Sequence, residues 1–309
     1  MIICYGEILL DQFESTNKKT QYVGGAPFNV FYQIHKMGVP SLFVGNISDD
    51  KEGKVIQKFF KDNKLDTKGL SIIKDKKTTT AKVTLSNGER TFSLNRNNVA
   101  DNCFSDDTLD FISLGNIIHV GSFLLETNES RLFLDKIIDY SKKQNKTLSF
   151  DLNYREDLFS SKEEALSIYE KYYPQFDIVK MSLDELKLIT EKEDIEEALS
   201  KLKMGLEVYL ITLGKEGSIA YYKNKIVKVE SIKQHVVDTT GAGDAFMGAF
   251  LANIDTIGLN ETLFIPSLLK STLKFSNIAG ALTTRKYGAI PSIPSYKEIN
   301  EVLEKNTKF

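Results

Sequence analysis

Apolar and polar positions alternate along this chain in blocks that predict short strands followed by helices. Short apolar runs are typical of buried strands, and the longer amphipathic stretches between them have helical spacing. The predicted strands are Ile2–Gly6, Ser41–Gly45, Asn116–Ser122, Thr147–Asp151, Asp177–Lys180 and Val208–Gly214. The predicted helices are Pro27–Met37, Asp49–Asp62, Asn128–Lys143, Ser182–Thr190, Leu263–Thr283 and Ser295–Leu303. Strands that alternate with helices in this way favour a parallel sheet with helices on both faces.

Two regions follow a different pattern. Thr79–Leu85 and Arg90–Arg96 each alternate between apolar and polar residues, and Asn87-Gly88 between them is a strong hairpin signal. The inserted hairpin suggests a small sheet that stands off the main domain and acts as a lid, a dimer surface or both; a purely decorative hairpin is the alternative. A second antiparallel ribbon is predicted at Ser218–Tyr222 and Ile226–Val229, whereas the segment after Asp11, from Gln12 to Tyr22, is polar. The expected fold is therefore α/β, a doubly wound and mostly parallel sheet with a small β lid.

The stretch from Val236 to Phe250 has the most distinctive chemistry. An apolar strand end at Val236-Val237 is expected to run into a turn of small residues, and a buried helix follows. Gly241 and Gly243 then lie at a helix N-terminus, where free N–H groups and the helix dipole suit a phosphate or a similar oxyanion. Asp244 is either an ordinary residue that compensates the dipole or a general base beside the anion.

Other polar residues fall at predicted strand ends or in the turns beyond them, where ligands bind in open α/β sheets. They are Asp11, Asn153, Arg155, Lys180 and Thr212. Gly24 and Gly25 allow a backbone to approach a ligand closely, and Pro27 begins the helix that follows. Ser182 and Glu185 form a capping box, which gives Glu185 a structural role as an alternative to a metal or phosphate role.

Composition narrows the functional class. The chain has 309 residues and a net charge of −2, which offers no electrostatic footprint for nucleic acid or an anionic membrane. No apolar run is long enough to span a bilayer, and the N-terminus lacks a signal pattern. Two cysteines are too few for a disulfide framework, so we expect a soluble protein of the reducing cytoplasm. Only five arginines are present, so bidentate phosphate recognition has few candidates.

The familiar nucleotide-binding motifs are absent. The sequence contains no G-x-x-x-x-G-K-[ST] phosphate loop and no protein-kinase H-R-D or D-F-G signature. The segment Gly241–Asp244 lies late in the chain and lacks the third glycine of a dinucleotide-binding fingerprint, and Ile2–Gly6 leads into Glu7 rather than a glycine-rich turn. A nicotinamide-dependent oxidoreductase is therefore disfavoured. Helix-start amides beside an aspartate instead provide two requirements of phosphoryl transfer, charge stabilisation and a proton acceptor.

Two motifs of the sequence resemble those of a known family. Asp238–Phe246 is similar to the C-terminal signature of the ribokinase-like carbohydrate kinases, also called the phosphofructokinase B family, and Gly24–Val30 to their N-terminal diglycine motif. The resemblance extends from Gly6 to about Pro294, and the bacterial fructokinase branch is the most similar. Leu152, where that branch often has proline, and Asn97–Val99 in the lid turn depart from the pattern and bear on sugar specificity more than on catalysis.

The resemblance implies roles for individual residues. Asp244 would accept the proton of the sugar hydroxyl, and the amides of Gly241, Ala242 and Gly243 would hold charge on the transferred phosphoryl group. Arg155 would neutralise phosphate charge. The sugar-binding residues implied are Asp11, Gly24, Gly25, Asn29, Arg96 (from the lid) and Asn153. The nucleotide-binding residues implied are Lys180, Glu185, Thr212, Gly214, Gly217 and Asn277.

The resemblance also implies cofactors and a domain division. ATP would be the phosphoryl donor, with Mg²⁺ organised by Glu185 through water, and Asp238 and Thr240 resemble a K⁺ site that some members use. Residues 1–11, 24–77 and 103–309 would form the α/β domain that binds sugar and nucleotide, and residues 12–23 and 78–102 the lid. The exposed lid sheet is compatible with a homodimer through the lid.

The resulting hypothesis is an ATP-dependent sugar kinase that converts fructose to fructose 6-phosphate. Within the same class, 2-keto-3-deoxygluconate kinase or a riboside kinase is the alternative. From a different class, a non-catalytic sugar-binding regulatory protein on the same scaffold is the alternative, and the intact Gly241–Asp244 segment argues against it.

Overall fold

A large sheet organises the molecule. The computed structural model describes residues 1–15, 18–86, 89–203 and 207–305. Nine strands of these residues lie side by side in the large sheet, in the order β13 (Lys225–Val229), β12 (Ser218–Tyr222), β11 (Val208–Thr212), β10 (Ile178–Ser182), β9 (Thr147–Asp151), β8 (Ile117–Val120), β1 (Ile2–Tyr5), β4 (Ser41–Ser48) and β5 (Leu70–Ile73). The strands from β11 to β5 are parallel, and β12 and β13 complete the sheet as an antiparallel ribbon.

Strand order reverses beside β1. The chain passes from β1 to β4 on one side, whereas β8 lies on the other side and leads through β9 and β10 to β11. In an open α/β sheet, such a reversal leaves a crevice outside the carboxyl ends of the neighbouring strands. The mostly parallel, doubly wound α/β fold expected from the sequence is confirmed, and the reversal places its ligand crevice beyond Tyr5.

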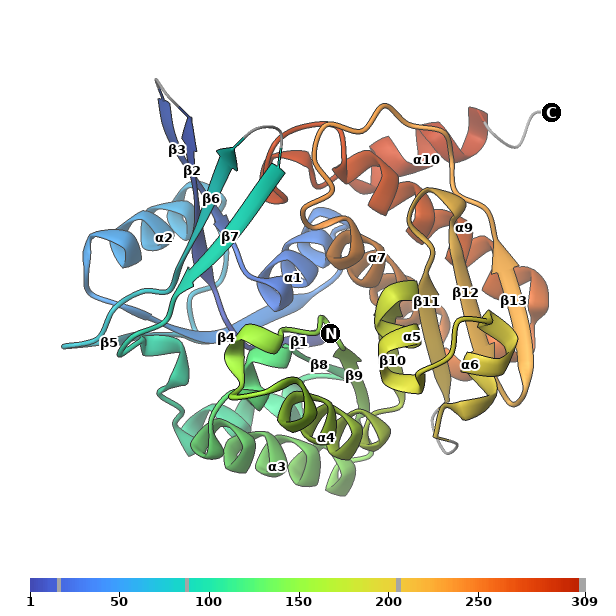
Figure 1. The fold of residues 1–309 in the computed structure, drawn as a ribbon, viewed down its shortest axis with the longest axis horizontal. Helices are drawn as coiled ribbons and strands as arrows, with labels where there is room; N and C mark the ends of the chain where they lie inside the picture. The colour runs from blue at the N-terminus through green and yellow to red at the C-terminus, as the bar shows by residue number, and fades with distance from the viewer. Residues whose placement is uncertain (16–17, 87–88, 204–206, 306–309) are drawn as a thin grey trace.

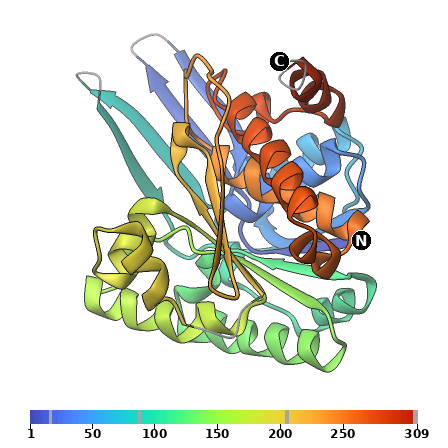
Figure 2. The same cartoon turned by 90° about the vertical axis from the view of Figure 1, so that its right-hand side faces the viewer.

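Helices cover both faces of the sheet, as Figures 1 and 2 show. One face is covered by α1 (Ala26–Lys36), α2 (Lys51–Asp62), α7 (Ala242–Ile257), α8 (Leu259–Phe264) and α9 (Pro266–Thr283), with α10 (Tyr296–Lys305) packed on α9. The other face is covered by α3 (Asn128–Lys143), α4 (Lys162–Tyr172), α5 (Leu183–Thr190) and α6 (Ile195–Lys201). The protein has one hydrophobic core on each face of the sheet. Successive side chains of a strand point to opposite faces, so Ile2 and Cys4 of β1 belong to one core and Ile3 and Tyr5 to the other.

A small mixed sheet forms the lid. Its strands lie in the order β3 (Lys18–Gly24), β2 (Leu9–Ser15), β6 (Thr80–Ser86) and β7 (Glu89–Asn95), with only the central pair, β2 and β6, parallel. Figure 1 shows these strands projecting from the body. The two predicted hairpin strands are present, and the Asn87-Gly88 turn lies outside the described residues. The strands β2 and β3 were not predicted, because their many polar residues hide the apolar alternation.

Two sequence-based expectations about elements are wrong. Val236-Val237 does not end a strand: the N–H groups of Val237 and Asp238 donate to the Thr284 carbonyl, so this segment is a loop tied to the end of α9. The predicted helix Leu263–Thr283 is two helices, since Pro266 begins α9 and cannot continue α8. The short strand β5 and the helices α4 and α6 were not predicted.

Candidate active site

A cavity of about 510 Å³ opens where the lid faces the carboxyl edge of the large sheet. It brings together residues that are far apart in the sequence. The lid and the start of α1 contribute Asp11, Gly25 and Asn29, and the strand ends of the body contribute Asn153, Arg155 and Lys180. The start of α7 and the turn before it contribute Thr240, Gly241, Gly243 and Asp244. Most of the polar residues singled out in the sequence therefore face one space.

The turn before α7 requires glycine. Gly241 is the N-cap of α7 with a φ of 76°, a left-handed conformation, and a Cβ there would lie 2.3 Å from the Ala289 Cβ. The Ala242 N–H donates to the Thr239 carbonyl at 3.2 Å. Among the described residues the N–H groups of Gly241 and Gly243 have no hydrogen-bond partner. These two amides are available for an anion, whereas Ala242 would first have to exchange its bond.

Asp244 lies in the first turn of α7 and links the two halves of the site. Its Oδ2 accepts a hydrogen bond of 2.8 Å from the Asn29 side-chain amide, on α1. Burial raises the pKa of the Asp244 carboxyl above its ordinary value, and the nearby Lys180 ammonium and the Asn29 bond act in the opposite direction. A carboxylate with a raised pKa beside an anion-binding helix start is suited to accept a proton.

On the lid side of the cavity, Asp11 of β2 packs closely against the diglycine. A Cβ at Gly24 would lie 2.5 Å from the Asp11 Oδ2, and a Cβ at Gly25, whose φ is 110°, would lie 2.6 Å from the Glu7 carbonyl oxygen. The two glycines are therefore needed for this close approach. Burial, followed by the charges of Asp238 and Asp244, raises the pKa of Asp11 to about 7.

Glu7 is a residue at this site to which the sequence assigned no role. It lies two residues after the end of β1, lines the cavity and is only 2% exposed. One carboxyl oxygen, Oε1, accepts the Ala26 N–H at the start of α1 at 3.0 Å, and the buried Oε2 has no partner among the described residues. Burial raises the pKa of Glu7 to about 8, against the lowering effect of Arg96. An acidic residue directly after an apolar strand was the available signal.

A stability prediction follows for Glu7. Because the pKa of Glu7 is raised in the folded state, the folded protein favours the protonated acid. The protonated acid therefore contributes to the free energy of unfolding in full below about pH 4.5, and this contribution is lost as the pH rises through about 8. The substitution Glu7→Gln keeps an acceptor for Ala26 and removes the titration. We expect the variant to be more stable than the wild type at pH 9, by on the order of 2–5 kcal/mol, and the difference to disappear near pH 4.5. Thermal unfolding across this range measures it, and parallel curves for the two proteins would contradict it.

On the opposite side of the cavity, Lys180 and Asp151 form a buried ion pair. Lys180 Nζ lies 3.0 and 2.8 Å from the two Asp151 carboxyl oxygens. Asp151 is the last residue of β9, and no role was predicted for it. Arg155 and Asn153 lie in the loop after β9, where Asn153 has a φ of 38° and Arg155 is exposed. The cavity thus has two cations near the amides of α7.

Glu185 forms the capping box predicted from the sequence. Its Oε2 accepts the Ser182 N–H at 2.6 Å, and its Oε1 accepts the Tyr154 N–H at 2.7 Å. Each oxygen keeps a lone pair for water, so the structural role leaves a water-mediated metal role possible. Glu185 fixes the loop that carries Arg155.

The remaining nucleotide candidates lie outside the lining of this cavity, along β11 to β13. Thr212 ends β11 between Ser182 and Ser218 of the neighbouring strands. Gly214 and Gly217 bound the following turn with positive φ angles, and a Cβ at Gly217 would lie 2.1 Å from the Val229 carbonyl oxygen. Asn277 on α9 donates to that same carbonyl at 3.0 Å. Their role in nucleotide binding stays a prediction.

Asp238 organises the loops beside α7. Its Oδ1 accepts both the N–H and the hydroxyl of Thr240, at 3.0 and 2.7 Å, and its Oδ2 accepts the Gly288 N–H at 2.9 Å. These bonds hold two loops together at the position proposed for K⁺.

Arg96 is placed differently from the expectation that it contacts the sugar. All five of its N–H groups donate to protein acceptors, which are Thr79, Asp101, Asn102 and Glu126. Its guanidinium also lies 4.4 Å from the centroid of the Phe123 ring, and it is not among the residues that line the cavity. These bonds connect the base of the lid to the body. Arg96 could contact a sugar only if one of its N–H groups gave up its bond to the protein.

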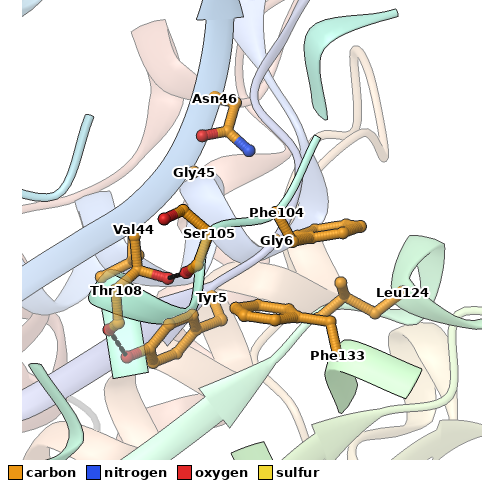
Figure 3. A pocket seen from close by; sticks show the side chains of 10 residues that line it. All are labelled: Tyr5, Gly6, Val44, Gly45, Asn46, Phe104, Ser105, Thr108, Leu124 and Phe133. Atoms are coloured by element: carbon orange, nitrogen blue, oxygen red, sulfur yellow. Dashed lines mark hydrogen bonds between the residues drawn. The ribbon is translucent and has the colours of Figure 1, made fainter. Parts of the chain in front are cut away.

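A second cavity, of about 20 Å³, lies on the other side of Gly6 and is shown in Figure 3. Its wall is mainly apolar, and the rings of Phe104 and Phe133 stack with centroids 4.7 Å apart. The Tyr5 hydroxyl donates to the Thr108 carbonyl at 2.6 Å. With so little space and a mainly apolar wall, this cavity is a packing gap of the core.

An amide cradle, a carboxylate beside it and a lid over the carboxyl edge of a doubly wound sheet define a ribokinase-like kinase of small molecules. The chain belongs to the pfkB carbohydrate kinases: residues 1–296 match the family described as pfkB family carbohydrate kinase. It is therefore a sugar kinase by family.

Curated relatives with similar sequences are plant proteins. The chain is 34% identical to a probable fructokinase-4 of Arabidopsis thaliana, with 99% of this chain and 97% of the relative covered. It is also 34% identical to fructokinase-1 of Zea mays, over 99% of this chain and 98% of that protein.

Two of the similar solved structures are of bacterial fructokinases. A fructokinase of Xylella fastidiosa with bound ATP has a TM-score of 0.92 at 27% identity, with 99% of both chains covered. A fructokinase double mutant of Vibrio cholerae with bound fructose, ADP and potassium has a TM-score of 0.88 at 27% identity, with 97% of both chains covered. Within the described residues of the present protein, no helix is long and apolar enough to cross a membrane.

Proposed function

We propose that this protein transfers the γ-phosphoryl group of ATP to the 6-hydroxyl of fructose. The observation that carries the proposal is the hydrogen bond from Asn29 to Asp244, which joins the diglycine side of the cavity to the helix start of α7. Asp11 faces the same cavity, so a polyhydroxyl compound and an oxyanion have adjoining places in it. The names of the relatives and of the similar structures add support for fructose.

Each residue of the site has its own role in the transfer of the phosphoryl group. Asp244 accepts the proton of the attacking hydroxyl as its oxygen bonds to the γ-phosphorus, and the bond from that phosphorus to the bridging oxygen breaks, which releases ADP. The amides of Gly241 and Gly243 hold the charge on the phosphoryl oxygens. Lys180, whose ammonium lies beside Gly243, and Arg155 neutralise phosphate charge.

The lid excludes water from this reaction. Its strands contribute the apolar side chains of Leu9, Ala81 and Leu94 to the cavity wall, opposite the polar groups of the body. Closing an apolar wall over the phosphoryl group disfavours hydrolysis of ATP and strengthens the electrostatic contacts inside. A homodimer through the lid stays a prediction.

Metal ions fit the site in a limited way. The described residues contain no cluster of three or more His, Cys, Asp or Glu side chains that could hold a metal. Mg²⁺ would therefore bind mainly to nucleotide phosphates and water, with Glu185 as a contact through water, and would neutralise phosphate charge there. A K⁺ ion would lie beside Asp238 and Thr240, where hydrogen bonds to Asp238 hold two loops together.

The setting of Arg96 favours a neutral sugar over an acid sugar. A kinase of 2-keto-3-deoxygluconate needs a further cation in the sugar pocket for the substrate carboxylate, and Arg96 is the candidate that the lid offers. Its five N–H groups are already bonded to the protein. Fructose makes no such demand.

The test is ADP release measured with a coupled enzyme over a panel of fructose, ribose, tagatose, 2-keto-3-deoxygluconate and nucleosides. We expect the highest kcat/KM with fructose. A higher kcat/KM with a nucleoside or with the acid sugar would replace the fructose assignment within the same class. No ADP release with any sugar would instead support a non-catalytic sugar-binding protein.

A further inference from the structure

We propose that Lys180 and Asp151 act as a pair that sets the ionisation of Asp244, so that Asp244 is a carboxylate before the nucleotide binds. This inference rests on the proposed function, because it takes Asp244 to be the base. It gives Asp151 a role as a positioning residue and gives Lys180 a role beyond phosphate binding.

The first observation is where the Lys180 ammonium lies. A Cβ added to Gly243 would be 2.6 Å from the Lys180 Nζ, so the ammonium sits against the first turn of α7, next to Asp244. That turn carries the positive end of a helix dipole, which disfavours a cation. Carboxylates must therefore offset the ammonium charge at this position.

The second observation is the geometry of the offsetting group. Both oxygens of Asp151 accept hydrogen bonds from Lys180 Nζ, at 3.0 and 2.8 Å, and the two residues are only 2% and 7% exposed. Burial acts to lower the pKa of Lys180, but the charges of Asp151, Glu185 and Asp244 outweigh it and the pKa lies above the ordinary value. Lys180 is therefore a fixed positive charge across the working pH range, bonded to Asp151 and also close enough to Glu185 and Asp244 to interact with their charges.

Charged and polar groups face Asp244 from every element packed around it. Asn29 of α1 donates to it, and Lys180 of β10 lies against the neighbouring residue. Arg155 after β9 lowers its pKa, Glu185 of α5 raises it, and Asp11 of β2 is close enough to interact with its charge. Among the groups that lower the pKa of Asp244 against the effect of burial, Lys180 has the largest effect. The negative charge of its partner Asp151 partly cancels the effect of Lys180 on Asp244.

This arrangement predicts opposite effects for the two members of the pair. In Lys180→Met, Asp244 loses a nearby cation, so its pKa should rise. The acid limb of the pH–rate profile, where activity falls as Asp244 is protonated, should therefore move to higher pH. In Asp151→Asn, Lys180 keeps its charge without its closest counter-ion, and the limb should move to lower pH. A nearby opposite charge shifts the pKa of a carboxyl group by about one to three units, so shifts of about one pH unit are expected.

The measurement is kcat/KM for ATP against pH at saturating sugar, because this quantity reports the enzyme before the nucleotide binds. The titration of ATP itself is common to all variants and cancels in the comparison. Lys180→Arg keeps the charge and should restore the wild-type limb more closely than Lys180→Met does. Lys270→Met, an exposed lysine on α9, is the matched control and should leave the limb unchanged.

Each single variant leaves one buried charge of the pair without its partner and could fail to fold. The double variant Lys180→Met/Asp151→Asn removes both charges of the pair and is the variant to use in that case. It should shift the limb upward by less than Lys180→Met alone. Shifts of the same sign in both single variants, or unshifted limbs in all of them, would overturn the inference. The sugar used is the one that the panel selects, so a substrate other than fructose would change the proposed function and leave this test intact.

Discussion

Asp244→Asn should lose at least about 10²-fold in kcat, the usual scale for a positioned acid–base group. The replacement has the same shape and can keep the bond to Asn29 that the Asp244 carboxyl makes at 2.8 Å. Because burial raises the pKa of this carboxyl, a neutral amide is tolerated there and the variant should fold. Steady-state rates of ADP release measure the loss, and calorimetric binding of the sugar should be nearly unchanged.

Asp139→Asn is the matched control for this variant. Asp139 is exposed on α3, far from the cavity, and the same change of charge should leave kcat unchanged there. Near-normal turnover of a folded Asp244→Asn protein would show that another group takes the proton.

Gly241→Ala is the second large effect. The added Cβ would meet Ala289 at 2.3 Å while the residue keeps a φ of 76°, so the start of α7 has to shift. Displacing helix-start amides from the phosphoryl group should reduce kcat/KM by about 10²-fold, the scale seen when one donor of an anion hole is removed. Rates under the same conditions as for Asp244→Asn test this.

Gly38→Ala separates the clash from the backbone strain. Gly38 has nearly the same φ, 75°, but a Cβ there would meet nothing within 4 Å. We expect it to lower the free energy of unfolding by about 1 kcal/mol, the cost of a left-handed non-glycine residue, with normal kcat/KM. If both glycine variants lose activity equally, the argument from the anion hole fails.

Much of the body of the fold could be predicted because its strands are buried on both faces. The predicted Thr147–Asp151 strand and Asn128–Lys143 helix agree with β9 and α3 to the residue. The lid strands β2 and β3 could not be predicted in the same way, since a sheet that projects from the body has fewer buried positions to mark its period.

The candidate site divides along similar lines. Local motifs indicated the glycines and Asp244, because helix starts and tight turns are encoded by neighbouring residues. The Asp151–Lys180 pair joins residues 29 positions apart, and the bond between Arg96 and Glu126 joins residues 30 positions apart. Such partners depend on strand order, which the spacing of residues does not reveal.

The central claim is that the two halves of the cavity join ATP and a sugar in one transfer. The most direct measurement is ³¹P NMR of the purified protein with ATP, Mg²⁺ and fructose, with a matched sample that lacks the sugar. The account predicts equal amounts of ADP and fructose 6-phosphate with fructose, and slow ATP loss without it. Inorganic phosphate at the same rate in both samples, or no ADP in either, would contradict it.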